Sequence, residues 1–210
     1  MRALSIEGIT IEFLGHASFK ITTSGKTIYF DPYILPEKIE KADLILITHD
    51  HYDHCDEGNV RKLIKDDGMV VAPSACATKL PGLEIRKAKP DEQFNLKGIE
   101  IETVHAYNPE KGYHPKNSGI GYIITLDKKR IYHAGDTEFV PEMKNIKNID
   151  VALLPIGGTY TMDAKQAAQA ANLIKPKIAV PMHYNTFDMI KANPKDFEKI
   201  VDKDIEVKIL

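Results

Sequence analysis

The length, composition and charge of the chain fit a globular protein and argue against several other classes. Its 210 residues are 43% hydrophobic and 28% charged, with a formal net charge of −2. This balance argues against a strongly basic protein that binds nucleic acid. No segment approaches the ~20 apolar residues that a membrane-spanning helix needs. We therefore expect one domain over residues 1–210 without membrane contact, and nucleic acid is disfavoured as a partner.

The N-terminus and the cysteines indicate the compartment. Residues 1–7 contain neither an extended apolar run nor a cleavage pattern, so we expect no signal peptide. Two cysteines, Cys55 and Cys76, are expected to remain reduced, as is typical of cytoplasmic proteins. The sequence thus predicts a cytoplasmic protein.

Short strands dominate the first half of the chain. Apolar runs and alternating patterns predict strands at 9–13, 19–23, 27–30, 44–47, 69–72, 84–87, 94–96 and 99–104. The second and third of these form a hairpin across Ser24-Gly25-Lys26. Helices are predicted at 59–65, closed by Asp66-Asp67-Gly68, and at 75–80.

The second half repeats this organisation. Strands are predicted at 119–126, 129–133, 151–154, 178–180 and 205–209, the last as an edge strand, and helices at 162–174 and 197–201. The stretch 106–118 reads as a long loop, which makes it a candidate for contact with a substrate.

Histidines and carboxylates are concentrated just after the apolar strand at 44–47. His49 and His51 are two residues apart, so in an extended segment their side chains point the same way. Asp53 and His54 come beside them if the chain then turns. This arrangement suits two adjacent divalent metals, with the histidine pair on one and the Asp-His pair on the other. Imidazole and carboxylate ligands are typical of Zn, Mn or Fe sites of this kind.

Other predicted strands also end near residues that can bind metal. The four such residues are His49, His105, Asp136 and His183. Proteins built on sheets place their sites where strand ends converge. We therefore expect these side chains to meet at one edge.

These motifs resemble the signature of the metallo-β-lactamase-fold hydrolases. The resemblance rests on His49-x-His51-x-Asp53-His54, followed by His105, Asp136 and His183, and covers nearly the whole chain. Further motifs, Gly15-His16-Ala17-Ser18-Phe19 among them, look like a group of small metal-dependent hydrolases related to ascorbate-phosphate lactonase. The resemblance implies an α/β fold, a four-layer αββα sandwich with two mixed β-sheets face to face and helices outside.

The resemblance also implies roles for the ligands. The first metal would be held by His49, His51 and His105, the second by Asp53, His54 and His183, and Asp136 would bridge both. Zn or Mn is expected for the two ions, and Fe or Ni is compatible with the same ligands. Two such ions can share a hydroxide and polarise a scissile carbonyl or phosphoryl group. Asp53 would orient this nucleophile and carry its proton, while Thr48 and Asp50 would hydrogen-bond the histidines.

Polar residues outside the ligand set are further candidates for the site. His16 and His114 are further candidate catalytic residues. Together with His114, Lys116 and Asn117 could bind an anionic or carbonyl group above the metals, or could lie in a solvated loop.

The function expected from this resemblance is hydrolysis of an ester or lactone bond in a small molecule, which could be anionic. Several alternatives stay open. A phosphodiesterase or nuclease could use the same two metals, and a di-iron redox centre could use the same ligands. A non-catalytic binding module stabilised by metal is a further alternative. The related lactonase group also makes a homo-oligomer compatible with the sequence.

Overall fold

The computed structural model describes residues 3–23 and 25–210. Met1 and Arg2 of the N-terminal stretch, and Ser24 of the predicted hairpin turn, lie outside the described residues. Within the described part of the chain, no helix is long and apolar enough to cross a membrane.

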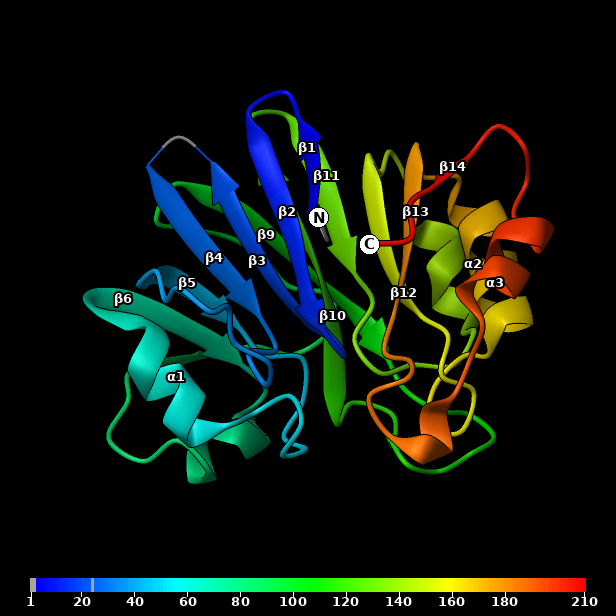
Figure 1. Cartoon of the computed structure of the whole chain (residues 1–210). Coiled ribbons are helices and arrows are strands. Elements are labelled where there is room, and N and C mark those ends of the chain that lie inside the picture. Colours follow the sequence, from blue (N-terminus) through cyan, green and yellow to red (C-terminus); the bar gives the residue numbers. More distant parts are fainter. Residues whose placement is uncertain (1–2, 24) are drawn as a thin grey trace.

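Two seven-stranded sheets pack face to face (Figure 1). The first sheet has the order β1-β2-β3-β4-β5-β6-β7 and the second β14-β13-β12-β11-β10-β9-β8. The strands of the first are β1 (Ala3–Ile6), β2 (Ile9–Gly15), β3 (Ser18–Thr23), β4 (Lys26–Phe30), β5 (Ala42–Leu46), β6 (Ile64–Ala72) and β7 (Ile85–Lys87). Those of the second are β8 (Gln93–Leu96), β9 (Ile99–Ala106), β10 (Gly119–Leu126), β11 (Lys129–His133), β12 (Val151–Pro155), β13 (Ile178–Met182) and β14 (Glu206–Val207).

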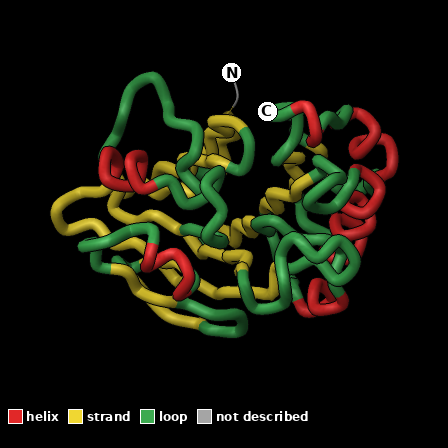
Figure 2. The backbone as a smooth tube through the Cα atoms, turned by 90° about the horizontal axis from the view of Figure 1, so that it is seen from below, coloured by secondary structure: helices red, strands yellow, loops and turns green. Residues whose placement is uncertain are grey.

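Helices cover the outer faces of both sheets (Figures 1 and 2). On the first sheet, α1 (Glu57–Leu63) buries Val60 and Leu63 in a small core over β4, β5 and β6. On the second sheet lie α2 (Ala164–Ile174) and α3 (Pro194–Ile200). Three short 3₁₀ helices complete the chain: η1 (Ser74–Thr78), η2 (Pro141–Asn145) and η3 (Asp188–Ile190). The predicted αββα sandwich is thereby confirmed.

The two sheets repeat one pattern of strand pairing. Pairs from β1 to β4 are antiparallel and pairs from β4 to β7 parallel; likewise, pairs from β8 to β11 are antiparallel and pairs from β11 to β14 parallel. Parallel neighbours end at the same edge of a sheet, so the residues that follow them are brought together. Asp31 follows β4 in the first sheet, and Asp136 comes shortly after β11, the corresponding strand of the second.

Hydrogen bonds between the two sheets hold these edges against each other. The amide of Ile120 in β10 donates to the carbonyl of Thr48 at 2.9 Å, just beyond the end of β5. The buried hydroxyl of Tyr122 donates to the carbonyl of Ile47 at 2.8 Å. The large apolar core fills the space between the sheets, so this edge is fixed by packing as well as by polar contacts.

The structure differs from the predicted elements mainly around α1. The turn expected at residues 66–68 is absent from the described structure, because α1 ends at Leu63 and β6 begins directly at Ile64. Gly68 permits this close approach: a Cβ there would lie 2.8 Å from the carbonyl oxygen of Ala42 in β5. In addition, β1 was not predicted, and the helix expected at 75–80 is the 3₁₀ helix η1.

Candidate metal centre

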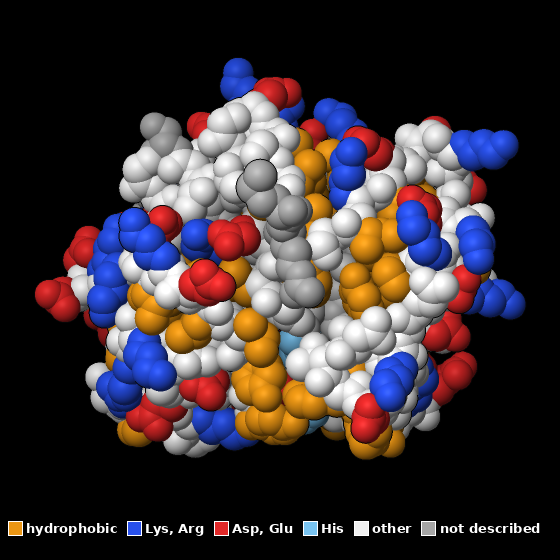
Figure 3. Space-filling view, in the orientation of Figure 1, with side chains coloured by type: hydrophobic (Ala, Val, Ile, Leu, Met, Phe, Trp, Pro, Cys, Tyr) orange, Lys and Arg blue, Asp and Glu red, His pale blue; other side chains and the backbone are white. Residues whose placement is uncertain are grey.

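A cluster of histidines and carboxylates lies at the edge where the two sheets meet. The loops that follow β5, β9 and β13 gather at the lower end of the molecule in Figure 1. In the space-filling view, histidine side chains are visible at the lower middle, between apolar side chains (Figure 3). Three groups of side chains there could hold a metal ion: His16, Asp53, His54 and His183; His49, His51 and His114; and His49, His54 and Asp136.

A buried carboxylate, Asp31, fixes the orientation of two of these histidines. Oδ2 of Asp31 lies 2.7 Å from Nδ1 of His54 and accepts a hydrogen bond from Oγ1 of Thr48 at 2.7 Å. That same Thr48 oxygen lies 3.0 Å from Nδ1 of His49. In this series of hydrogen bonds the Nδ1 atoms of His49 and His54 are both donors. The Nε2 atom of each ring therefore keeps its lone pair. His49 and His54 are therefore prepared to bind a cation through Nε2.

This arrangement predicts the effect of replacing Asp31 with asparagine. The amide group would place a donor against Nδ1 of His54, and this ring would then carry its proton on Nε2. We expect D31N to weaken metal binding by about 10–100-fold, measured by competition with a chromogenic chelator.

Asp43 offers a matched control. Its carboxylate also accepts a backbone hydrogen bond, from Thr27 at 2.8 Å, but it contacts Lys65 rather than a histidine. D43N should leave metal affinity unchanged. An equal loss in both variants would show that Asp31 acts only through general stability.

Asp136 is the carboxylate around which the cluster is assembled. Its Oδ2 lies 3.0 Å from Nε2 of His183 and 3.5 Å from Nε2 of His114, and its Oδ1 lies 3.4 Å from Nε2 of His54. Ligand atoms bound to one tetrahedral ion at about 2.0–2.2 Å lie roughly 3.3–3.6 Å apart. The observed separations are close to that range.

Several buried atoms of the cluster lie close to one another but form no hydrogen bond of good geometry among the described residues. They are Nε2 of His49, Nε2 of His54, Nε2 of His183 and Oδ1 of Asp136. Unpaired buried polar atoms are costly unless another group satisfies them. Three of these residues, His49, His54 and Asp136, form one group whose ligand atoms lie within 4.8 Å of one another, so the residues present suit the donor set of a divalent cation.

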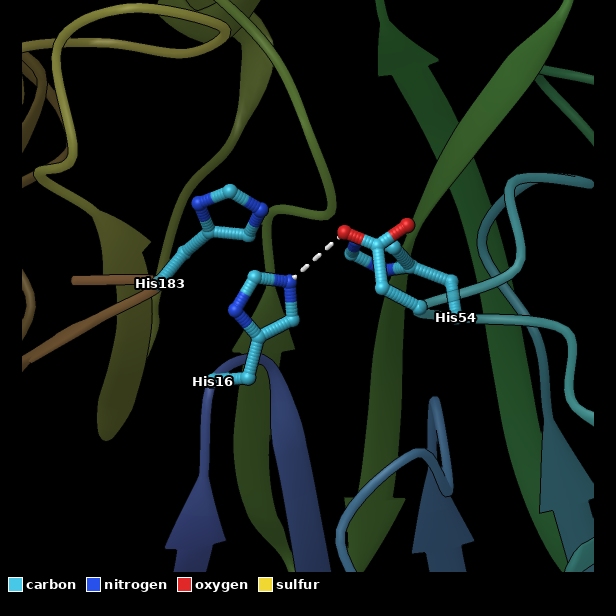
Figure 4. Close-up of side chains that lie close together, drawn as sticks. His16, His54 and His183 are labelled. Carbon is cyan, nitrogen blue, oxygen red and sulfur yellow. Dashed lines mark hydrogen bonds and ion pairs between the residues drawn. The ribbon is translucent and has the colours of Figure 1, made fainter. Parts of the chain in front are cut away.

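His16, His54 and His183 approach one another from three separate segments (Figure 4). Nε2 of His16 lies 3.0 Å from Oδ2 of Asp53, the contact shown as a dashed line. The carbonyl of His16 accepts the amide hydrogen of His183 at 2.7 Å, which links the β2–β3 turn to the end of β13. His16 thus contacts both Asp53 and His183, and its catalytic role stays a prediction.

His114 reaches the cluster from the loop between β9 and β10. Its Nε2 lies 3.2 Å from Nδ1 of His51, and its ring lies 4.8 Å from that of His49. Asn108 holds it in place, since its Oδ1 accepts from the amide of His114 at 3.0 Å and contacts Nδ1 of the same residue. The loop is closed by the amide of Asn108, which donates to the carbonyl of His114.

His105, predicted as a ligand of the first metal, lies outside the three candidate metal groups of the described residues. β8 pairs with β9 only as far as Glu102, and beyond that point the loop around Asp91 borders β9. Nε2 of His105 accordingly lies 3.1 Å from Oδ2 of Asp91. The position expected for His105 beside His49 and His51 is taken by His114.

Burial and charge set the protonation of the cluster. Burial lowers the pKa of His49 well below its usual value and lowers the pKa of both His16 and His114 to about 4. Burial would also lower the pKa of His54, but the charges of Asp136 and Asp31 outweigh it and raise that pKa well above the usual value. The two carboxylates thus favour a proton on His54 when no cation is present, and a divalent cation that binds Nε2 would displace that proton.

Sequence reasoning missed Asp31 and Asn108. The sequence signal available for Asp31 was a carboxylate directly after the predicted strand at 27–30. The predicted role of Thr48 as a partner of histidine is supported by its contact with His49, whereas Asp50 lies 3.2 Å from Nζ of Lys79 instead. Lys116 pairs with Glu142 at 2.8 Å.

This is a metallo-β-lactamase-fold protein, as the two-sheet sandwich and its cluster of histidines and carboxylates show. Comparison with known proteins gives the same fold family. Residues 10–183 match the beta-lactamase superfamily domain. The UPF0173 metal-dependent hydrolase of Thermococcus onnurineus is 40% identical, over 96% of this chain and 96% of its own. The chain therefore belongs to the beta-lactamase superfamily, in its group of UPF0173 metal-dependent hydrolases, and it is a metal-dependent hydrolase.

Solved structures show the same fold. A protein of Parabacteroides distasonis superposes with a TM-score of 0.87 at 36% identity, covering 99% of this chain and 96% of that one. The metallo hydrolase Igni18 of Ignicoccus hospitalis superposes with a TM-score of 0.82 at 32% identity, covering 96% of this chain and 94% of that one. The predicted family is thereby confirmed.

Proposed function

We propose that this hydrolase holds two divalent metal ions and cleaves an ester or lactone bond in a small molecule. One ion would be bound by His49, His51 and His114, the other by Asp53, His54 and His183, with Asp136 shared. The observation that carries this proposal is the position of Asp136, whose two oxygens lie 3.0 to 3.5 Å from imidazole nitrogens of both groups. A closed structural site needs only four ligands, so seven favour a catalytic pair.

The types of ligand also limit which metal ions can bind. Imidazole and carboxylate donors accept Zn or Mn, and Fe or Ni as well, with availability deciding among them. When bound, two such ions lower the pKa of a shared water and polarise the carbonyl under attack.

Asp53 and His16 would guide the proton in this reaction. Burial would raise the pKa of Asp53, but the hydrogen bond from His16 and the nearby His54 outweigh it and hold that pKa to about 2. Asp53 is therefore ionised at neutral pH and lines the cavity at the cluster. From there its carboxylate would accept a hydrogen bond from the attacking water, orient it, and pass its proton toward the leaving group.

Two measurements on the same sample test the proposal. Metal content by mass spectrometry, on untagged protein reconstituted with Zn or Mn, should give about two ions per chain. In parallel, a panel of lactones and simple esters should be hydrolysed faster than bis-p-nitrophenyl phosphate. One ion per chain would contradict the dinuclear assignment. Turnover of the phosphodiester alone would replace the ester reaction with the phosphodiesterase alternative.

A further inference from the structure

The cavity above the metal cluster has an apolar mouth. It encloses about 550 Å³ and has His51, Asp53, His114, Asp136 and His183 among its lining residues. Its remaining lining includes five apolar or aromatic side chains, which we call the aromatic mouth: Tyr52, Tyr113, Tyr160, Phe187 and Met189. Tyr52 is 66% exposed, Tyr113 50% and Met189 59%, so half of the six exposed large hydrophobic residues in the described chain gather here. Such a concentration indicates a binding surface.

The aromatic mouth is built by contacts between loops that are distant in sequence. On one side, the rings of Tyr113 and Tyr160 meet edge to face at 4.8 Å, and the hydroxyl of Tyr160 lies 3.3 Å from Sδ of Met189. On the other side, Tyr33 contacts both Tyr52 and Phe187, with ring centroids 6.0 and 6.2 Å apart. Rings held by one another keep their exposed faces available for a ligand.

The charges around the cavity disfavour an anionic substrate group. In the described part of the chain, Lys79 is the one Lys or Arg among the lining residues. Its Nζ is 3.2 Å from Oδ2 of Asp50 and also donates to the carbonyl of that residue, so its charge is already paired. An anionic group that extended past the metals would therefore lie against aromatic rings, with no unpaired cation among the described lining residues to stabilise its charge.

We propose that the substrate carries an uncharged apolar group, alkyl or aryl, beside its scissile carbonyl, and that the aromatic mouth binds this group. The inference rests on the proposed ester or lactone hydrolysis and specifies its substrate class. The cavity is large enough for a group of this kind together with the reacting carbonyl.

A series of p-nitrophenyl esters tests this directly on the metal-loaded protein. From acetate to octanoate, kcat/KM should rise about two- to fourfold for each added methylene until the cavity is filled. Benzoate distinguishes an aryl preference from an alkyl one. The hemisuccinate ester, which ends in a carboxylate, should be at least about tenfold poorer than the butyrate ester. The proposal would be overturned if kcat/KM did not change with chain length, or if the hemisuccinate ester were a better substrate than the butyrate ester.

Variants at the mouth connect the preference to these residues. Tyr113→Ser should lower the octanoate-to-acetate ratio of kcat/KM at least about tenfold, whereas Tyr113→Phe keeps the ring and should keep the ratio. Leu173→Ser is the matched control, because Leu173 is an exposed apolar residue on α2 and should leave the ratio unchanged. If Tyr113→Ser also left it unchanged, the aromatic mouth would not be the binding surface.

A binding measurement separates this inference from the proposed reaction. Calorimetric titration of the metal-loaded protein with 2-butanone and 2-octanone, which cannot be hydrolysed, should show tighter binding of the longer ketone, and Tyr113→Ser should remove the difference. Ketone selectivity without hydrolysis of any ester or lactone would overturn the reaction and support the apolar site. Ester hydrolysis with neither chain-length dependence nor ketone selectivity would overturn the apolar site and leave the reaction standing.

Discussion

Replacing Asp53 with asparagine is expected to lower turnover by about 10²–10⁴-fold while the chain still folds. The asparagine side chain has nearly the same shape and still offers one oxygen to Nε2 of His16, which lies 3.0 Å from Oδ2 of Asp53. It carries no charge, however, so it binds the second metal weakly and cannot accept a proton. Steady-state kinetics on the best ester of the panel, with metal content measured on the same sample, gives the size of the effect.

The control for this variant is Asp50→Asn in the same loop. Asp50 pairs with Lys79 at the rim of the cavity and touches none of the histidine rings in the described contacts. D50N should keep turnover within about threefold of the original protein, as expected for an exposed ion pair. Turnover of D53N at the level of D50N would remove Asp53 from the mechanism, and an unfolded D53N would assign it a structural role instead.

The fold and most of the cluster could be predicted because local pattern and chemistry agreed. The apolar run before Thr48 is a buried strand, and its end places His49, His51 and His54 in the candidate metal groups, as their spacing indicated. Asp136 and His183 also reach the cluster, since they follow strands of the second sheet whose ends lie at the same edge.

What could not be predicted depends on contacts between distant segments. Asp31 directly follows the predicted strand at 27–30, and only the parallel pairing of β4 with β5 brings its carboxylate to Thr48 and His54. Residues 66–68 have the composition of a turn, yet they continue β6, because Gly68 fits against the carbonyl of Ala42. In both cases tertiary pairing overrides a local signal.

His105 and His114 also show that sequence alone could not identify one of the candidate metal ligands. His105 follows a clean alternating strand, so its position beside the metals was a reasonable expectation. The strand continues past it to Ala106, however, and its ring contacts Asp91. His114 lies in the loop that was expected to contact the substrate. Its amide donates to Oδ1 of Asn108, and the amide of Asn108 donates to the carbonyl of His114. These two hydrogen bonds turn the ring of His114 inward.

A pair of alanine variants decides between these two histidines. His114→Ala should reduce the metal content from about two ions to about one per chain and lower turnover at least about 100-fold, because it removes one of the three imidazoles that we assign to the first ion. His105→Ala should keep both ions and turnover within about twofold, because its partner Asp91 is an exposed carboxylate away from the cluster. The two substitutions remove the same side chain from neighbouring segments, and thermal unfolding of both variants shows whether a loss of metal reflects a loss of fold. Loss of metal in His105→Ala with retention in His114→Ala would restore the ligand set expected from sequence alone, and would mean that the loop after β9 rearranges when metal binds.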